Sequence, residues 1–215
     1  MSRAMSKSEK EALVSELIKI IHWLDGYRAY RCVEPSMIEK SFTKFPTGYL
    51  RNSWREVRED IYKIATFPTS FPKIGKVYTL ATVAKLFLGV LFLLFMFTTI
   101  ARTRGAESAF GINLNNLSLA IAIALCAVIG LYYLSNILAY KMIDRCYREH
   151  EHILGKRRKK LKSATQSLID RLAYYMRKFG YDPENYRFKL FYADYEGISV
   201  HKRDRKKMYT VSIKI

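Results

Sequence analysis

Acidic residues and cysteines are scarce in this chain. Among 215 residues, 19 Asp and Glu stand against 37 Lys and Arg, which gives a formal net charge of +18. The three cysteines, Cys32, Cys126 and Cys146, are an odd number, and on the topology argued below none lies on the outer side of a membrane. A framework of disulfide bonds is therefore not expected.

The sequence also lacks the local signatures of common catalytic sites. It contains no glycine-rich phosphate loop, no serine nucleophile elbow and no paired-acid motif. Cys146 and His150 are four residues apart and would share a helix face, but zinc needs three or four ligands and no further Cys/His pair is nearby. We therefore expect no enzymatic reaction, no cofactor and no bound metal.

Long apolar runs are present, in the windows 80–101 and 117–140. A helix over either window reaches about 33–36 Å, which is enough to cross a hydrocarbon core of about 30 Å. The Leu, Ile, Val and Phe residues of the first window favour insertion by about 4–8 kcal/mol, whereas Lys85 opposes it by at most about 3 kcal/mol. We therefore expect two membrane-spanning helices, with the Lys85 ammonium group reaching toward the lipid headgroups. The first run begins far from the N-terminus, so it is not expected to be a secretion signal.

The distribution of basic residues predicts the orientation. Residues 1–79 hold 14 Lys and Arg and residues 141–215 hold 20, whereas the connector 102–116 holds only Arg102 and Arg104. Two spans place both ends of the chain on one side, and the positive-inside rule assigns that side to the cytoplasm. We expect a multi-pass protein of the plasma membrane with both termini cytoplasmic.

The fold class expected is an α-helical membrane protein: a two-span hairpin with a cytoplasmic N-terminal helical region and a small C-terminal α+β module. The boundaries are a helical region at 1–78, spans at 79–101 and 117–140 joined by an external loop at 102–116, a basic helical stalk at 141–162, and the α+β module at 163–215. In that module, Tyr209, Val211 and Ile213 alternate with polar residues, as in a half-buried strand. We expect a three-stranded antiparallel meander with helix 163–180 on one face.

Two basic runs are candidate contact sites for a polyanion or for lipid. The first contains Lys156, Arg157, Arg158, Lys159, Lys160 and Lys162, and the second contains Lys202, Arg203, Arg205, Lys206 and Lys207. On an upright helix that leaves the membrane at Tyr140, Lys156 would stand about 24 Å from the span, beyond the Debye length of about 8 Å. Either the helix bends at Gly155 and lays the first run onto anionic headgroups, or the run stays solvated, or it meets another polyanion such as RNA or the ribosome.

Small residues recur at four-residue steps along the second span. Ser118, Ala122, Cys126 and Gly130 form a ridge that lets another helix approach closely. The ridge packs either against the first span of the same hairpin or against a second copy of the chain.

These features favour a binding function. We expect a membrane-anchored adaptor or scaffold that holds a cytoplasmic protein partner at the bilayer. The first alternative is a tether for RNA or ribosomes through residues 156–162 and 201–207. The second alternative is a subunit of an oligomeric channel or a membrane enzyme.

Overall fold

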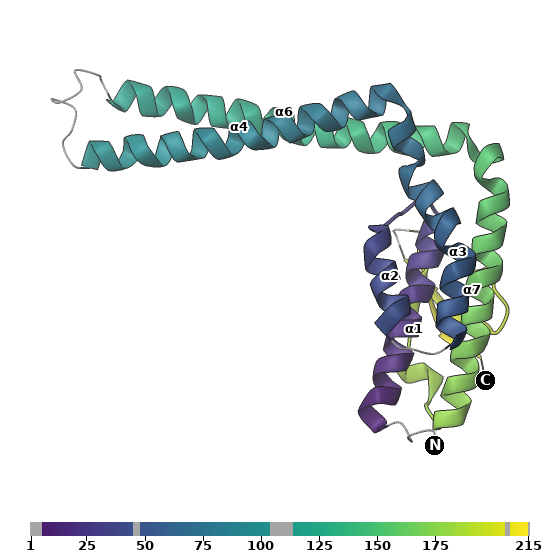
Figure 1. Cartoon of the computed structure of the whole chain (residues 1–215). Coiled ribbons are helices and arrows are strands. Elements are labelled where there is room, and N and C mark those ends of the chain that lie inside the picture. Colours follow the sequence, from purple (N-terminus) through teal and green to yellow (C-terminus); the bar gives the residue numbers. More distant parts are fainter. Residues whose placement is uncertain (1–5, 45–47, 104–113, 205–206, 215) are drawn as a thin grey trace. The chain divides into compact units, whose positions relative to one another are not determined.

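The chain is mostly helical and divides into two compact units. The computed structural model describes residues 6–44, 48–103, 114–204 and 207–214. One unit, here called the terminal unit, comprises Met1–Phe67 and Glu149–Ile215, and the other, the hairpin unit, comprises Pro68–Arg148. The prediction of a mainly helical chain with two long apolar helices and a small three-stranded antiparallel sheet is confirmed (Figure 1).

Four helices form the frame of the terminal unit: α1 (Lys7–Arg28), α2 (Pro35–Lys44), α3 (Gly48–Thr66) and α7 (Glu151–Phe179). A capping box starts α1, because the Ser6 hydroxyl accepts from the Glu9 N–H while the Glu9 carboxylate accepts from the Ser6 N–H. Helix α1 packs along α7, α2 packs on α3, and α3 also contacts α7 (Figure 1). The two ends of the chain therefore build one bundle together.

The core of this bundle is apolar and nearly free of solvent exposure. Burying one Leu or Ile side chain stabilises a fold by about 1.5–3 kcal/mol, so the facing stripes of α1 and α7 hold the unit together. On α1 the stripe is Leu13, Val14, Leu17, Ile20, Ile21 and Leu24, and on α7 it is Leu154, Leu161, Leu168, Ile169, Leu172 and Met176.

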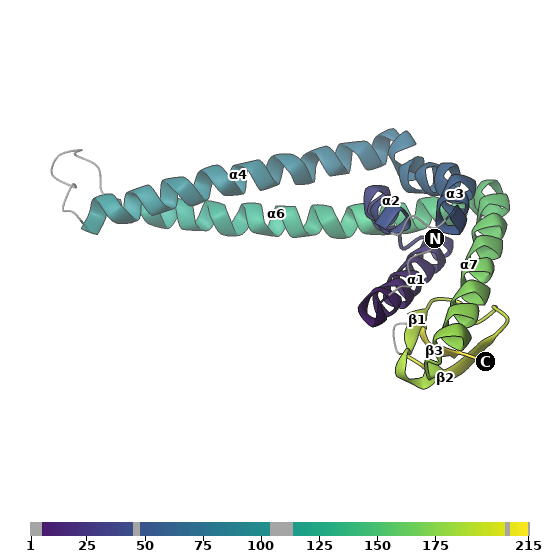
Figure 2. The ribbon, with the colours of Figure 1, turned by 60° about the horizontal axis from the view of Figure 1, so that its bottom comes forward.

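A sheet of three antiparallel strands completes the terminal unit: β1 (Phe188–Leu190), β2 (Ile198–Arg203) and β3 (Tyr209–Ile213). The strand order is β1-β3-β2, so the predicted meander is wrong: β3 lies between the other two (Figure 2). The reason lies after β1, where the backbone N–H groups of Phe191 and Tyr192 bond to Asp25 on α1 instead of entering a hairpin turn. Among the described strands, β1 pairs with β3 alone, in the register Phe188 with Val211.

A one-residue interruption of the helix separates α7 from the helix before it. Helix α6 (Leu114–Glu149) ends one residue before His150, and α7 begins one residue after it. The backbone of His150 has φ −108° and ψ 21°, outside the helical region. Residues 141–162, which the sequence analysis treats as one stalk, are therefore shared between two helices. Gly155, the expected bend, lies inside α7.

The hairpin unit consists of a short 3-10 turn, η1 (Phe67–Ser70), and two long helices, α4 (Pro72–Thr103) and α6. The two helices lie side by side in both views (Figures 1 and 2). Along each runs a stripe of buried or half-buried side chains at alternating steps of three and four residues, the spacing of a helix-pairing seam. On α4 these are Ala81, Ala84, Leu88, Leu91, Phe95 and Thr98, and on α6 they are Ile121, Leu125, Val128, Tyr132, Ser135 and Ala139.

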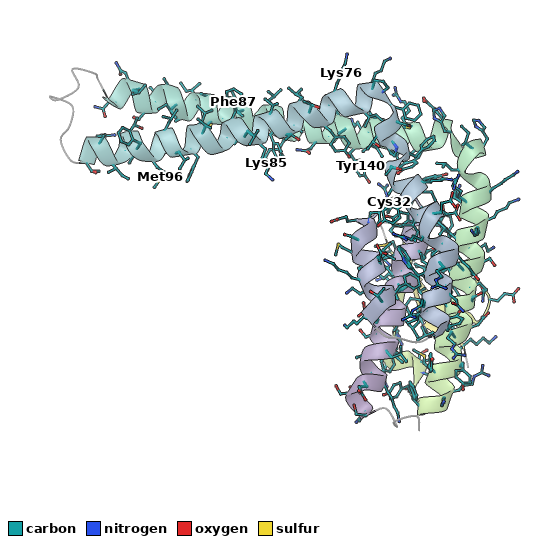
Figure 3. The ribbon with its side chains drawn as sticks, in the orientation of Figure 1. Cys32, Lys76, Lys85, Phe87, Met96 and Tyr140 are labelled. Atoms are coloured by element: carbon teal, nitrogen blue, oxygen red, sulfur yellow. The ribbon has the colours of Figure 1, made fainter. Side chains whose placement is uncertain are left out.

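Outside this seam the hairpin exposes its apolar side chains. In the most apolar window of α4 only 11% is buried, and in that of α6 none is, although both helices are long and apolar enough to cross a membrane. Phe87 and Met96 are 58% and 45% exposed, and the Met96 and Lys85 side chains point outward from the helix pair (Figure 3). An exposed apolar surface that extends along two whole helices is not typical of a protein fully surrounded by water, whose exposed apolar patches are usually small.

Candidate functional site

A buried carboxylate on α1 fixes the segment that follows β1. Asp25 is fully buried and accepts hydrogen bonds from the backbone N–H groups of Phe191 and Tyr192, the latter at 3.3 Å. Its second oxygen accepts from the Tyr195 hydroxyl at 2.7 Å. This one side chain therefore replaces the strand partner that the 191–195 segment lacks, and it joins the two ends of the chain.

Arg28, one helical turn further along α1, balances the charge. Its guanidinium group lies 3.6 Å from the Asp25 carboxylate and donates two hydrogen bonds, of 3.0 and 2.8 Å, to Asp194. The same group sits over the rings of Tyr192 and Tyr195, with centroids at 4.4 and 4.9 Å. A bidentate carboxylate contact combined with two aromatic faces is a geometry that Arg provides and Lys does not.

The protonation of this Asp25 cluster (Asp25, Arg28, Asp194 and Tyr195) follows from burial and pairing. Burial raises the pKa of Asp25 and outweighs its hydrogen bonds, whereas the hydrogen bonds from Arg28 lower the pKa of Asp194 from 3.8 to about 2. Burial and the neighbouring Asp25 charge raise the pKa of Tyr195. Asp25 and Tyr195 are buried, so these two groups order the chain, whereas the Asp194 side chain is 45% exposed.

Beside the Asp25 cluster lies an open pocket of about 600 Å³, here called the basic pocket. Its walls come from three segments: the residues after α1, the 191–194 segment and the β2–β3 hairpin. The lining residues are Ala29, Arg31, Phe191, Tyr192, Ala193, Asp194, Arg203, Lys207 and Tyr209. Three cations, three aromatic rings and one carboxylate thus face the same space.

The second basic run therefore contributes only in part to this pocket. Arg203 and Lys207 line it, and Lys202 is exposed but is not among the lining residues. Arg205 and Lys206 lie outside the described residues. Arg31 lies more than 170 residues before Lys207, and no local pattern in the sequence links the two residues.

The first basic run lies mostly against acidic and aromatic side chains of its own unit. Asp60 on α3 pairs with Arg157 at 2.8 Å and Lys160 at 3.0 Å, and Lys156 lines the same shallow pocket of about 300 Å³. Lys162 pairs with Asp194 at 2.9 Å.

Arg158 bridges the run to the 191–195 segment. It pairs with Glu151, donates to the Tyr192 hydroxyl at 2.8 Å and lies over the Tyr30 ring. Lys159 is exposed. Four of the six cations thus help to hold α7 in place, and contact with a polyanion through this run stays a prediction.

The ridge of small residues on α6 follows the seam only at its start. Ser118 and Ala122 are half-buried, whereas Cys126 and Gly130 are exposed, and a Cβ at Gly130 would meet nothing within 4 Å. A four-residue step turns about 400° around a helix, so the ridge rotates away from α4 by about 40° per step. Packing inside the hairpin accounts for the first two residues, and self-association through the others stays a prediction.

Cys32, Cys126 and Cys146 are not joined in disulfide bonds. In the described part of the chain no three His, Cys, Asp or Glu side chains are grouped to hold a metal ion. In comparisons with protein-family models, with curated proteins and with solved structures, nothing matches the chain. Its function must therefore be argued from its own residues.

Proposed function

We propose that the protein is a membrane-anchored adaptor: the α4–α6 hairpin crosses the bilayer, and the terminal unit is the binding domain held at its cytoplasmic face. The observation that carries the proposal is the apolar surface of the hairpin outside the seam. Helices of 32 and 36 residues have lengths of about 48 and 54 Å, more than a hydrocarbon core requires.

The packing of the terminal unit supports a hairpin with both ends on one side. Met1–Phe67 and Glu149–Ile215 share one core, and two halves of a core cannot meet across a bilayer. Five cations lie on the hairpin helices close in sequence to the terminal unit, and by the positive-inside rule they favour the cytoplasm for that side. They are Lys73, Lys76, Lys141, Arg145 and Arg148.

A binding role is favoured because the terminal unit presents the open basic pocket, whereas the buried Asp25 and Arg28 charges beside it are paired with each other. The alternative of an RNA or ribosome tether draws less support, since most of the first basic run contacts acidic or aromatic side chains of the unit itself. A channel subunit or membrane enzyme has no specific observation in its favour.

Cysteine accessibility tests the insertion and its orientation. In a chain with its three cysteines replaced by serine, Ser108→Cys in the connector should react with a membrane-impermeant maleimide in intact cells. Lys159→Cys on α7 should react only after lysis. The protein should also stay in the membrane pellet after alkaline carbonate extraction. Release by carbonate, or the opposite labelling pattern, would refute the proposal.

The adaptor role has its own test. A photo-crosslinking amino acid at Lys202 or Lys159, both exposed, should capture a defined protein in cells. Deleting the chain should then move that protein from the membrane to the soluble fraction. A captured protein whose membrane fraction does not change on deletion would argue against an adaptor.

A further inference from the structure

We propose that the basic pocket binds a nucleoside phosphate, with the phosphate held by Arg31, Arg203 and Lys207 and the base lying against the aromatic wall. The inference concerns the terminal unit alone and does not depend on whether the hairpin enters a membrane. It rests on the size of the pocket, its charge, its aromatic lining and the rigidity of its backbone.

The size of the pocket suits a small organic ligand. Its volume of about 600 Å³ lies within the range of about 300–1,000 Å³ that is usual for small-molecule sites. It opens between three chain segments, so a ligand can enter without displacing an element of the fold.

The charge of the pocket favours an anion. Asp194 is the one acidic residue among the lining residues, and its carboxylate is already engaged by Arg28 and by Lys162. With three cations, Arg31, Arg203 and Lys207, against this one carboxylate, the described lining carries a net positive charge. The negative end of the α1 dipole lies near Ala29, but the backbone N–H groups of Ala29, Tyr30 and Arg31 bond to the last carbonyl groups of the helix. Fork-shaped Arg donors match the oxygens of a phosphate group.

The aromatic lining favours a planar group beside the phosphate. Phe191, Tyr192 and Tyr209 border the pocket, and the Arg203 guanidinium group lies over the Tyr209 ring at 5.4 Å. Rings and Arg planes of this kind stack on nucleic-acid bases without selecting one base strongly. A bare inorganic anion would leave this wall unused.

The backbone around the pocket is held in place from several sides. Asp25 fixes the N–H groups of Phe191 and Tyr192, and Arg158 donates to the Tyr192 hydroxyl at 2.8 Å. The Arg31 N–H donates to the Gly26 carbonyl at 2.8 Å, and this hydrogen bond fixes the position of the Arg31 backbone relative to the end of α1. Binding therefore requires no ordering of the backbone at Arg31, Phe191 and Tyr192, which reduces its entropic cost.

Calorimetric titration of the full chain in detergent micelles tests the proposal. The probes are AMP, ADP, GDP and UDP, with adenosine, inorganic phosphate and inositol 1,4,5-trisphosphate for comparison. We expect at least one nucleotide to bind with a Kd below about 1 mM, more tightly than adenosine or phosphate, and more weakly as salt is added.

The matched variants remove equal charge inside and outside the pocket. Arg203→Ala with Lys207→Ala should weaken nucleotide binding about tenfold or more, because each lost cation removes charge-assisted hydrogen bonds. Lys202→Ala with Lys214→Ala, two exposed cations of the same sheet region, should change it less than about twofold. Circular dichroism melting confirms folding, and Lys207→Gln, a single exposed change, serves if the double variant unfolds.

Several results would overturn the proposal. One is that none of the four nucleotides binds below about 1 mM. Another is that the two double variants weaken binding equally, which places the ligand elsewhere. A third is that inorganic phosphate or the inositol phosphate binds more tightly than every nucleotide, which removes the role of the base.

Discussion

At the scale of single residues, long-range partners decide the structure of the terminal unit. Asp25 and Tyr195 are 170 positions apart, and Arg28 and Asp194 are 166 apart. Within the sequence, Asp25 and Arg28 look like ordinary polar residues near the end of an amphipathic helix. No local pattern could have indicated that these two side chains are buried, because their burial depends on a segment from the other end of the chain.

The basic residues show the same limit. The two basic runs of the sequence predict contact sites at Arg203 and Lys207, which line the basic pocket, and equally at Arg157 and Lys160. The latter two pair with Asp60, an acid on α3. Whether a run of cations forms a positive surface depends on its acidic partners, and here the partner Asp60 lies 97 positions before Arg157, where no local pattern reveals it.

Asp194 gives a prediction for the dependence of stability on pH. Its pKa is lowered to about 2 in the folded chain from 3.8, so the folded state binds fewer protons at this group than the unfolded state does. The stabilisation is therefore complete above about pH 4 and is lost as the pH falls toward 2. The side chain is 45% exposed, and solvent screening reduces the effect, so we expect about 1 kcal/mol.

Thermal melting of the full chain at several pH values checks this. Asp194→Asn should melt about 2–4 °C below the wild type above pH 4, and the two curves should converge near pH 2. Asp170→Asn, an exposed acid on α7, is the control and should keep the wild-type profile. A difference between Asp194→Asn and wild type that persists unchanged at pH 2 would show that Asp194 acts by packing and not by charge.

At the scale of elements, periodicity found the helices and strands but not their arrangement. Alternating residues predicted β3 correctly, yet the order β1-β3-β2 depends on Asp25 holding the chain after β1. In the hairpin, the small-residue ridge was read at four-residue steps, whereas the seam alternates steps of three and four. The seam cannot be recognised from the sequence, because nearly every position in both helices is apolar and seam residues such as Leu88 and Tyr132 do not differ in type from their neighbours.

The seam predicts how the hairpin responds to a larger side chain. Ala84 is 3% exposed in the seam, so Ala84→Leu should push α4 and α6 apart by about 1–2 Å and destabilise their packing by about 1–3 kcal/mol. Pulsed electron spin resonance between nitroxides at positions 86 and 134, both exposed, measures the separation.

The control for this change has the same chemistry on an exposed face. Ala127→Leu places the same new side chain on the exposed part of α6 and should leave the separation unchanged. Equal separations in both variants would mean that the helices do not meet along this seam.

At the scale of the whole molecule, the hairpin unit is inserted between two parts of the terminal unit. The rings of Phe67 and His150, where the chain leaves and rejoins the terminal unit, are 5.5 Å apart between centroids. A short link can therefore replace the hairpin. The sequence predicts separate regions at 1–78 and 163–215, because no local pattern indicates that the two ends of the chain share one core.

We predict that a chain in which a flexible linker of about eight Gly and Ser residues replaces residues 68–148 folds without detergent. Size-exclusion chromatography should give a soluble species, and circular dichroism should give a cooperative melt. The fragment 149–215 alone should fail to melt cooperatively, because the apolar stripe of α7 has lost α1. Insolubility of the linked chain, or independent folding of the fragment, would contradict the shared core.

The inserted hairpin also imposes an order of events during synthesis. Helices α1 to α3 leave the ribosome first, and they must wait with the α1 stripe uncovered until α7, some 80 residues later, has been made. If the hairpin spans a membrane as proposed, a nascent chain whose second apolar helix fails to insert would place α7 on the wrong side of that membrane and leave the α1 stripe open to chaperones and proteases. Under that proposal, the bundle can close only after both apolar helices have been inserted.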